Sequence, residues 1–72
     1  MTRDRETAQG ELVWAAAEQL VTEAGGPVPD VDVAEASGIE LEHVRAWLDE
    51  SAGVRFEIAR DGDARTVLAP MR

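Results

Sequence analysis

The chain is short and acidic: its 72 residues carry 15 Asp and Glu against 7 arginines, with no lysine and no cysteine, for a formal net charge of −8 at pH 7. This length predicts one small domain over residues 1–72, and the missing cysteines exclude disulfides and thiolate metal sites. No apolar run approaches the roughly 20 residues of a membrane span, and no basic and apolar leader opens the chain, so we expect a cytoplasmic protein without a membrane segment.

The first predicted helix covers residues 11–24. Apolar side chains recur at helical spacing on one of its faces, namely Val13, Ala16, Ala17, Leu20 and Ala24. The segment 25–27, Gly-Gly-Pro, cannot continue a helix and ends it. Because glycine inside a helix costs about 1 kcal/mol, Gly10 places the start of the helix between Asp4 and Glu11.

Trp14 does not fit the apolar stripe of this helix. On a helical wheel it falls about 110° from the centre of the stripe. One interpretation is a residue at the rim of the core that packs on the N-terminal segment or on the C-terminal hairpin. The other is an anchor for a second chain, because tryptophan is enriched at interface hot spots.

Two further helices, about residues 33–37 and 41–52, form a helix-turn-helix. Asp32 is the predicted N-cap of the shorter one, with Glu35 completing a capping box. Gly38 ends that helix, because its position needs a left-handed backbone. The longer helix has one apolar stripe, made by Leu41, Val44 and Leu48. Before both helices, Val28 lies between two prolines and can form only a very short edge strand.

Residues 54–69 predict a β-hairpin. Apolar side chains alternate along its first strand, at Val54, Phe56 and Ile58, and Asp61-Gly62 is a hairpin turn signal. A two-residue loop would place Phe56 opposite Val67, and a loop one residue longer would place it opposite Leu68. We favour the longer loop because it buries Leu68. Across the domain, we expect the most buried side chains to be Leu20, Val44, Leu48 and Phe56.

The order of these elements resembles the winged helix-turn-helix family. The segments that carry the resemblance are VDVAEASGI (31–39), HVRAWL (43–48) and VRFEIARDGDARTVLAP (54–70). The resemblance implies a mainly α fold with a small β-hairpin, that is, an α+β arrangement of three helices and a C-terminal β-wing. It also implies a third helix that enters the major groove of DNA and a wing that touches the backbone or the minor groove. The positions used in this way would be Glu42, His43, Arg45, Ala46 and Asp49 on the helix, and Arg60 and Arg65 on the wing.

The charges of the third helix argue against such groove reading. Its exposed face is expected to show three carboxylates against Arg45 alone, and Arg45 is spaced to pair with Glu42 and Asp49 on the same helix. Affinity for DNA comes largely from basic residues that displace counterions. We therefore favour a protein-protein interaction adaptor, or an accessory component of a regulatory system, that binds a protein with a basic surface and is not an enzyme. Its candidate contacts are Glu42, His43, Asp49, Glu50 and Trp14.

The alternative is a DNA-binding transcriptional regulator that contacts nucleic acid through Arg45, Arg60 and Arg65. Proteins of a high-salt cytoplasm carry acidic surfaces and still bind DNA, so the charge alone does not exclude this hypothesis. An acidic face can also be merely solvated, or can mimic DNA in the groove of a DNA-binding protein. A homodimer is compatible with each of these hypotheses.

The sequence predicts no catalytic site, no metal site and no cofactor. His43 is the only histidine, and a single histidine on an acidic helix is usually solvated. Asp61-Gly62-Asp63 predicts a β-turn, because a calcium loop needs several more spaced oxygen ligands. Neither Ser37 nor Ser51 has a base beside it that would activate a nucleophile.

Overall fold

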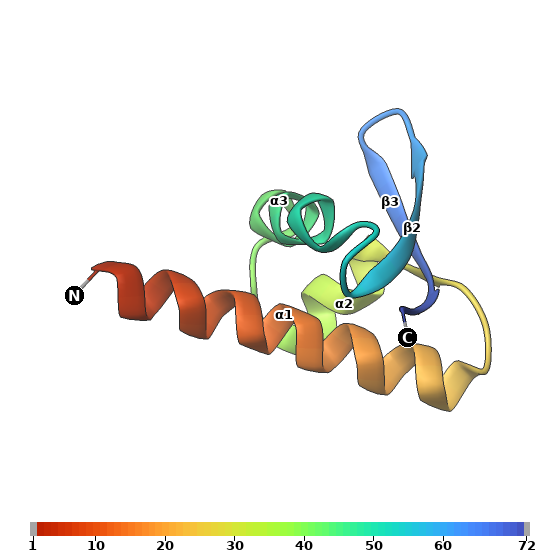
Figure 1. The fold of residues 1–72 in the computed structure, drawn as a ribbon, viewed down its shortest axis with the longest axis horizontal. Coiled ribbons are helices and arrows are strands. Elements are labelled where there is room, and N and C mark those ends of the chain that lie inside the picture. The colour runs from red at the N-terminus through yellow and green to blue at the C-terminus, as the bar shows by residue number, and fades with distance from the viewer. Residues whose placement is uncertain (1, 72) are drawn as a thin grey trace.

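Three helices come first in the chain, and a β-hairpin follows them (Figure 1). The computed structural model describes the backbone of residues 2–71 and the side chains of residues 8–71. Its elements are α1 (Thr2–Ala24), β1 (Val28–Pro29), α2 (Asp30–Ser37), α3 (Leu41–Ser51), β2 (Phe56–Asp61) and β3 (Ala64–Pro70). The strands form one antiparallel sheet in the order β1-β3-β2. This α+β arrangement confirms the predicted fold class and is consistent with a winged-helix layout.

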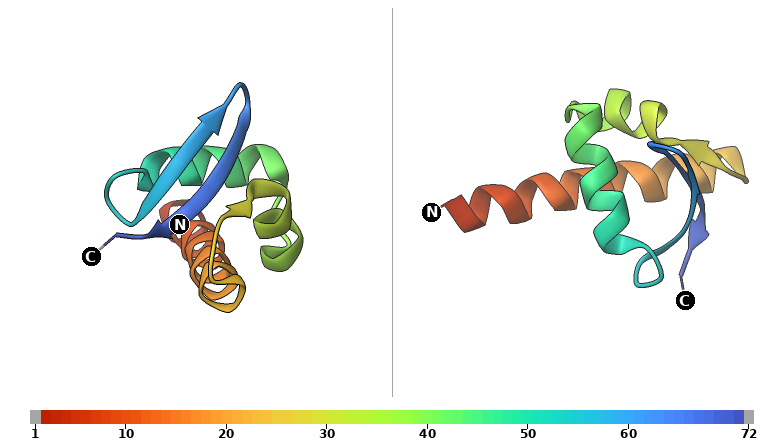
Figure 2. Two further views of the ribbon diagram at one scale, coloured as in Figure 1. Left: turned by 90° about the vertical axis from the view of Figure 1, so that its right-hand side faces the viewer. Right: turned by 90° about the horizontal axis from the view of Figure 1, so that it is seen from above.

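The core lies where α1, α2, α3 and the sheet meet, and α3 crosses over α1 (Figure 2). Its fully buried apolar side chains are Val13, Ala17, Val33, Val44, Leu48 and Val67. Phe56 is also buried, so the prediction holds for Val44, Leu48 and Phe56. It was wrong for Leu20, which is half-buried beside a hollow that α1 shares with α2. Val21 is buried instead, because β1 and β3 pack against α1 as well as α2 and α3.

Helix α1 begins at Thr2, before the predicted range of Asp4 to Glu11, and continues through Gly10. The reason is a close contact: Gly10 is buried, and a Cβ atom there would lie 2.9 Å from Cε3 and Cζ3 of Trp47. The glycine therefore lets the indole of α3 lie directly on the backbone of α1. The low helix propensity of Gly10 was mistaken for a helix boundary. The sequence does not reveal its contact with Trp47, because that residue is 37 positions away in the chain.

Replacing Gly10 by alanine is expected to destabilise the domain by about 1–3 kcal/mol, although alanine favours the helix by about 1 kcal/mol. The added methyl group would collide with the Trp47 ring, whose Nε1 is held by a hydrogen bond to Gln9. Urea unfolding followed by circular dichroism measures the loss. Gly26→Ala is the control, since a Cβ at Gly26 would meet no atom within 4 Å. A Gly10→Ala domain as stable as this control would contradict the proposed packing.

Helix α2 begins at Asp30, and its N-cap is Pro29 with extended backbone and no capping side chain. Asp32 therefore lies inside the helix, and the predicted capping box was wrong. The carboxylate of Asp30 is occupied elsewhere, by bonds to α3 and β3. The predicted end is confirmed: Gly38 has a φ of 74° and donates its amide hydrogen to the carbonyl of Ala34.

Helix α3 ends at Ser51, and a turn precedes the hairpin. Val54 was predicted to lie in the first strand, but it sits in this turn and is 74% exposed. The turn is tied to the end of α3 by hydrogen bonds from the amides of Val54 and Arg55 to the carbonyl of Ser51. The strand itself begins only at Phe56.

The hairpin has a two-residue loop, Gly62-Asp63, so the longer loop that we favoured was wrong. The loop also lies one residue later than the turn signal, because Asp61 pairs with Ala64 inside the ladder. Ile58 lies opposite Val67, and a bulge between Glu57 and Ile58 then shifts the register. Val67 is consequently buried, and Leu68 points away from the core.

The predicted edge strand is confirmed. Val28 and Pro29 pair with Val67 and Thr66 of β3 at the side of the sheet away from β2.

Within residues 2–71, no helix combines the length and the apolar composition that crossing a lipid bilayer requires.

Candidate interaction surface

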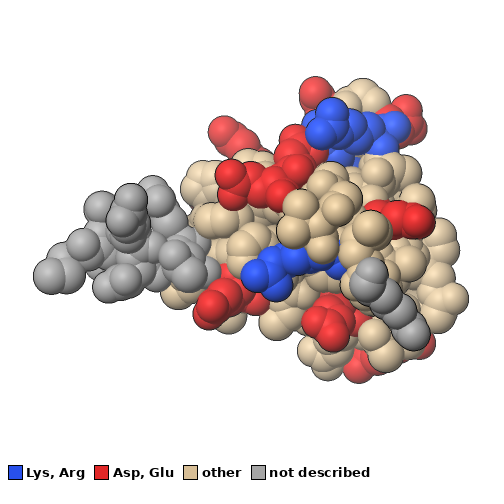
Figure 3. Space-filling model, viewed as in Figure 1, with Lys and Arg blue, Asp and Glu red and all other residues tan. Residues whose placement is uncertain are grey.

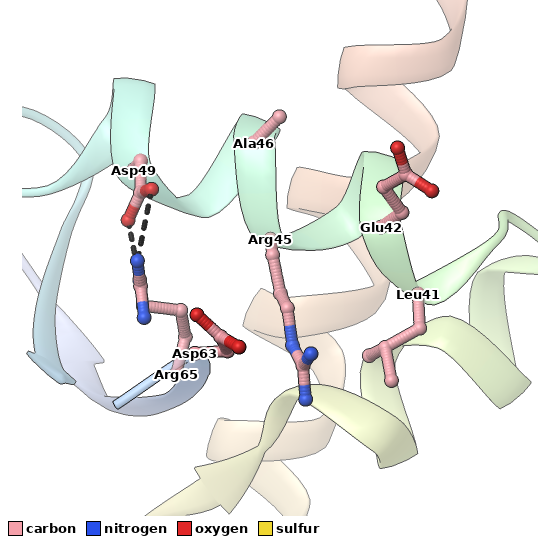
Figure 4. A pocket seen from close by; sticks show the side chains of 7 residues that line it. All are labelled: Leu41, Glu42, Arg45, Ala46, Asp49, Asp63 and Arg65. Atoms are coloured by element: carbon pink, nitrogen blue, oxygen red, sulfur yellow. Dashed lines mark hydrogen bonds and ion pairs between the residues drawn. The ribbon is translucent and has the colours of Figure 1, made fainter. Parts of the chain in front are cut away.

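The exposed face of α3 lies between two hollows. The wing-side hollow, about 630 Å³, separates α3 from the hairpin and is lined by Leu41, Glu42, Arg45, Ala46, Asp49, Asp63 and Arg65 (Figure 4). The α1-side groove, about 510 Å³, separates α3 from α1 and is lined by Gln9, His43, Ala46, Trp47 and Glu50. Ala46 lines both. The small alanine therefore forms a low point on the face of α3, where another molecule can approach the helix closely.

Arg45 is paired with Asp30, at the start of α2. Its Nε donates to Oδ2 of Asp30 at 2.7 Å, and the backbone amide of Arg65 donates to the same oxygen at 2.8 Å. The Asp30 side chain is buried, so its charge needs these donors. The predicted pairing of Arg45 with Glu42 and Asp49 was wrong: Figure 4 shows Glu42 on the opposite side of α3 from Arg45, and the carboxylate of Asp49 turned towards Arg65. The buried carboxylate of Asp30 attracts Arg45 more strongly than the carboxylates of Glu42 and Asp49 do, because water screens a buried charge less.

Asp49 is paired with the hairpin. Arg65 donates from Nε to Oδ1 at 2.6 Å and from Nη2 to Oδ2 at 3.2 Å, so the two side chains form a bidentate pair. The Nη1 of Arg65 donates to the carbonyls of Gly62 and Ala64. Arg60 lies farther away, with its Nε 3.7 Å from Oδ1 of Asp49. Chiefly the hydrogen bond from Arg65, aided by the charges of both arginines, holds the pKa of Asp49 below its usual value of 3.8.

This shift predicts a loss of stability in acid. A carboxylate with a lowered pKa in the folded state stabilises the fold above the pKa of the unfolded chain, and the benefit disappears as the pH falls through the folded pKa. Asp49→Asn should therefore cost about 0.5–1 kcal/mol near neutral pH, a small value because the Asp49 side chain is 36% exposed and screened by water. The difference between wild type and variant should shrink as the pH falls below the unfolded-state pKa of about 3.9, and it should vanish only below the lowered pKa of folded Asp49.

Urea unfolding at a series of pH values measures this difference. Asp32→Asn is the control, since Asp32 is exposed, lies in α2 and forms no ion pair among the described residues. A difference between wild type and Asp49→Asn that persisted unchanged in acid would contradict the assigned role of the charge.

The arginines predicted to contact nucleic acid are thus engaged within the chain. Arg45 and Arg65 are held by Asp30 and Asp49, and both arginine side chains are partly buried. Arg60 is 63% exposed, but its nearest carboxylate is again Asp49. Each arginine that lines the wing-side hollow is therefore already paired with a carboxylate of the chain.

The remaining carboxylates of α3 face solvent. Glu42 and Glu50 are exposed, and among the side chains of residues 8–71 neither forms an ion pair. His43 is exposed and lines the α1-side groove, as Glu50 does. In Figure 3, acidic side chains cover the surface over α3, directly beside the basic side chains near the tip of the hairpin. The structure thus brings Glu42, His43 and Glu50 together around Ala46, with Asp49 turned towards the wing.

Trp14 lies apart from this surface. It lines neither hollow; its ring is perpendicular to Trp47 at a centroid distance of 5.5 Å, and its Nε1 donates to the carbonyl of Trp47 at 3.5 Å. The guanidinium carbon of Arg55 lies 4.1 Å from the Trp14 ring centre. These contacts fit the interpretation of Trp14 as a rim residue.

Three residues of the surface were missed from the sequence. They are Asp30, the buried partner of Arg45, and Trp47 and Gln9, which line the α1-side groove. Trp47 carried a usable signal, because a tryptophan at the border of an amphipathic stripe is often half-exposed. Gln9 carried no such signal in the sequence, because it reaches the α1-side groove only if α1 continues through Gly10.

Within residues 8–71, no group of three or more His, Asp or Glu side chains is placed to hold a metal ion.

No family model, no curated protein and no solved structure matches this chain. The functional proposal therefore depends on the geometry and charge of the side chains described above.

Proposed function

We propose that the chain is a small interaction module of the winged helix-turn-helix type, which binds a basic surface of a protein partner through the exposed face of α3. It would act as an adaptor or as an accessory component of a regulatory system. The observation that carries the proposal is the arrangement around Ala46: Glu42 and Glu50 face solvent, whereas the neighbouring arginines are bound by Asp30 and Asp49.

The charge of this surface disfavours DNA. The two hollows are lined by four carboxylates and two guanidinium groups, and each guanidinium already has a carboxylate partner. A DNA phosphate in the wing-side hollow would have to displace Asp49 from Arg65 and would face Glu42 and Asp63. Protein neutralisation of phosphates supplies most non-specific affinity for DNA, and this surface offers little of it.

The shape of the surface suits a protein. Ala46 keeps the centre of the α3 face low, and the hollows on its two sides can receive side chains of a partner. Opposite charges on two partners accelerate their encounter and fix their orientation, and the attraction weakens as salt rises. We therefore expect salt-sensitive binding to a basic protein surface centred on Ala46.

A peptide of alternating arginine and lysine residues, titrated into isotope-labelled protein, tests the proposal. Amide shifts should concentrate on α3 around Ala46, and Glu42→Lys/Glu50→Lys should weaken binding about tenfold. The matched control is Glu23→Lys/Glu35→Lys, which changes the net charge equally at exposed positions of α1 and α2. Equal losses in the two double variants would mean that the peptide senses net charge alone, and would overturn the assigned surface.

A second pair of variants leaves the charge unchanged. Ala46→Gln should fill the low point of the α3 face and weaken binding of the peptide, whereas Ala36→Gln on the exposed face of α2 should not. Unimpaired binding by Ala46→Gln would show that the partner does not approach α3 at its centre.

A further inference from the structure

The two hollows beside α3 differ in how their charges are balanced. Arg45 and Arg65 line the wing-side hollow, and the chain's own carboxylates bind them. The α1-side groove is lined by one carboxylate, Glu50, and by no lysine or arginine among the described residues. A cation that enters the α1-side groove therefore meets a carboxylate that has no ion-pair partner among residues 8–71, and it meets no competing arginine there.

We infer that the α1-side groove is a binding site for an arginine side chain of the partner. This inference rests on the proposed function and adds to it the residue type that is recognised. Glu50 is the counter-ion, the indole of Trp47 is the apolar wall, and the side-chain oxygen of Gln9 is a further acceptor.

The groove is built before any ligand enters it. Trp47 Nε1 donates to Oε1 of Gln9 at 2.9 Å, which ties α3 to α1 and fixes the indole. Gly10 supports the same ring from the backbone of α1, and Trp14 packs perpendicular to it. The Gln9 oxygen keeps a second lone pair after accepting from Trp47, so it can also accept from an entering N–H group. A wall fixed in this way loses little entropy when a side chain binds.

A guanidinium group fits this chemistry better than an ammonium group. It is planar, stacks on aromatic rings and pairs with a carboxylate through two parallel hydrogen bonds, whereas the lysine ammonium is a strongly hydrated point charge. The chain already shows both modes: Arg55 lies 4.1 Å over the ring of Trp14, and Arg65 binds Asp49 through two nitrogens. The α1-side groove offers an indole and a carboxylate together.

The experiment compares hexa-arginine with hexa-lysine, two peptides of equal formal charge, by titration into isotope-labelled protein. Hexa-arginine should bind about three- to tenfold more tightly, and it should shift the Trp47 indole signal and the Gln9 side-chain amide signals. Glu50→Gln should abolish this preference. Glu35→Gln, an equal loss of charge at an exposed position of α2, should preserve it.

The possible results separate this inference from the proposed function. Equal affinity for the two peptides, with shifts on α3 but none at Trp47 or Gln9, would overturn the arginine site and leave the basic-partner proposal standing. Shifts spread over the whole surface, or no binding of either peptide at low salt, would overturn both. A preference for arginine that survives Glu50→Gln would overturn the role of this groove.

Discussion

Leu48→Ala is expected to lower the free energy of unfolding by about 2–5 kcal/mol. Leu48 is fully buried and is the largest of the completely buried side chains. It lies in α3, which contacts α1, α2, β2 and β3, so the cavity would open at the centre of the domain. Small domains are stable by only about 5–15 kcal/mol, and a loss of this size would leave the variant partly unfolded or close to it.

Urea unfolding followed by circular dichroism measures this loss, with Leu12→Ala as the control. Leu12 is 54% exposed, so its truncation should change the stability by no more than about 0.5 kcal/mol. If Leu48→Ala unfolded at the same urea concentration as Leu12→Ala, the position of the core would be wrong.

Asp30→Ala is expected to cost about 2–4 kcal/mol, because one buried carboxylate joins three elements. It lies at the first position of α2, accepts from the side chain of Arg45 in α3 and accepts from the backbone amide of Arg65 in β3. Its removal would leave the Arg45 charge and the Arg65 amide without a partner. The cost falls short of that for a wholly enclosed ion pair because the Arg45 side chain is 30% exposed.

Two further variants separate the contribution of the Asp30 charge to this loss of stability from that of its hydrogen bond. Asp30→Asn keeps an oxygen that can accept from the Arg65 amide but removes the charge, so its loss of stability should be intermediate. Asp32→Ala, at an exposed position of the same helix, should be nearly neutral. Thermal unfolding of the three variants gives the order. A neutral Asp30→Ala would contradict the assigned role of Asp30 in joining α2, α3 and the hairpin.

Features that depend on neighbours in the sequence were predicted well. The left-handed glycine after α2, the burial of Val44 and Leu48 and the very short edge strand at Val28 follow from local periodicity and backbone preferences. The α+β order of elements follows from the same signals. Local rules succeeded where no distant residue competes with them.

The errors at α1 and α2 share a physical cause, which is a long-range contact that overrides a local preference. Trp47 makes a helical glycine favourable at Gly10 and extends α1. Arg45 and the Arg65 amide draw in Asp30, so that α2 begins two residues before the predicted cap at Asp32. The hairpin register has a separate, local cause: the loop lies at Gly62-Asp63, one residue after the turn signal, so neither predicted loop length gives the observed pairing of Ile58 with Val67.

The candidate site was predictable only in part. The exposed carboxylates of α3 follow from the helical wheel, because Glu42 and Glu50 lie opposite the apolar stripe. The pairing of the arginines does not, since it depends on which carboxylates are buried nearby. The α1-side groove was also beyond prediction from the sequence, because one of its walls is the part of α1 before Glu11.

The most direct test of the central claim, that α3 presents carboxylates to a protein and not arginines to DNA, is a titration of isotope-labelled protein with a generic DNA duplex at low salt. Electrostatic attraction is strongest under these conditions. The proposed function predicts unchanged amide signals for α3 and for Arg60–Arg65, because Asp30 and Asp49 already pair with Arg45 and Arg65 and Asp49 also lies near Arg60. Shifts confined to α3 and Arg60–Arg65 that shrink as salt is added would contradict the account and restore the DNA-binding hypothesis.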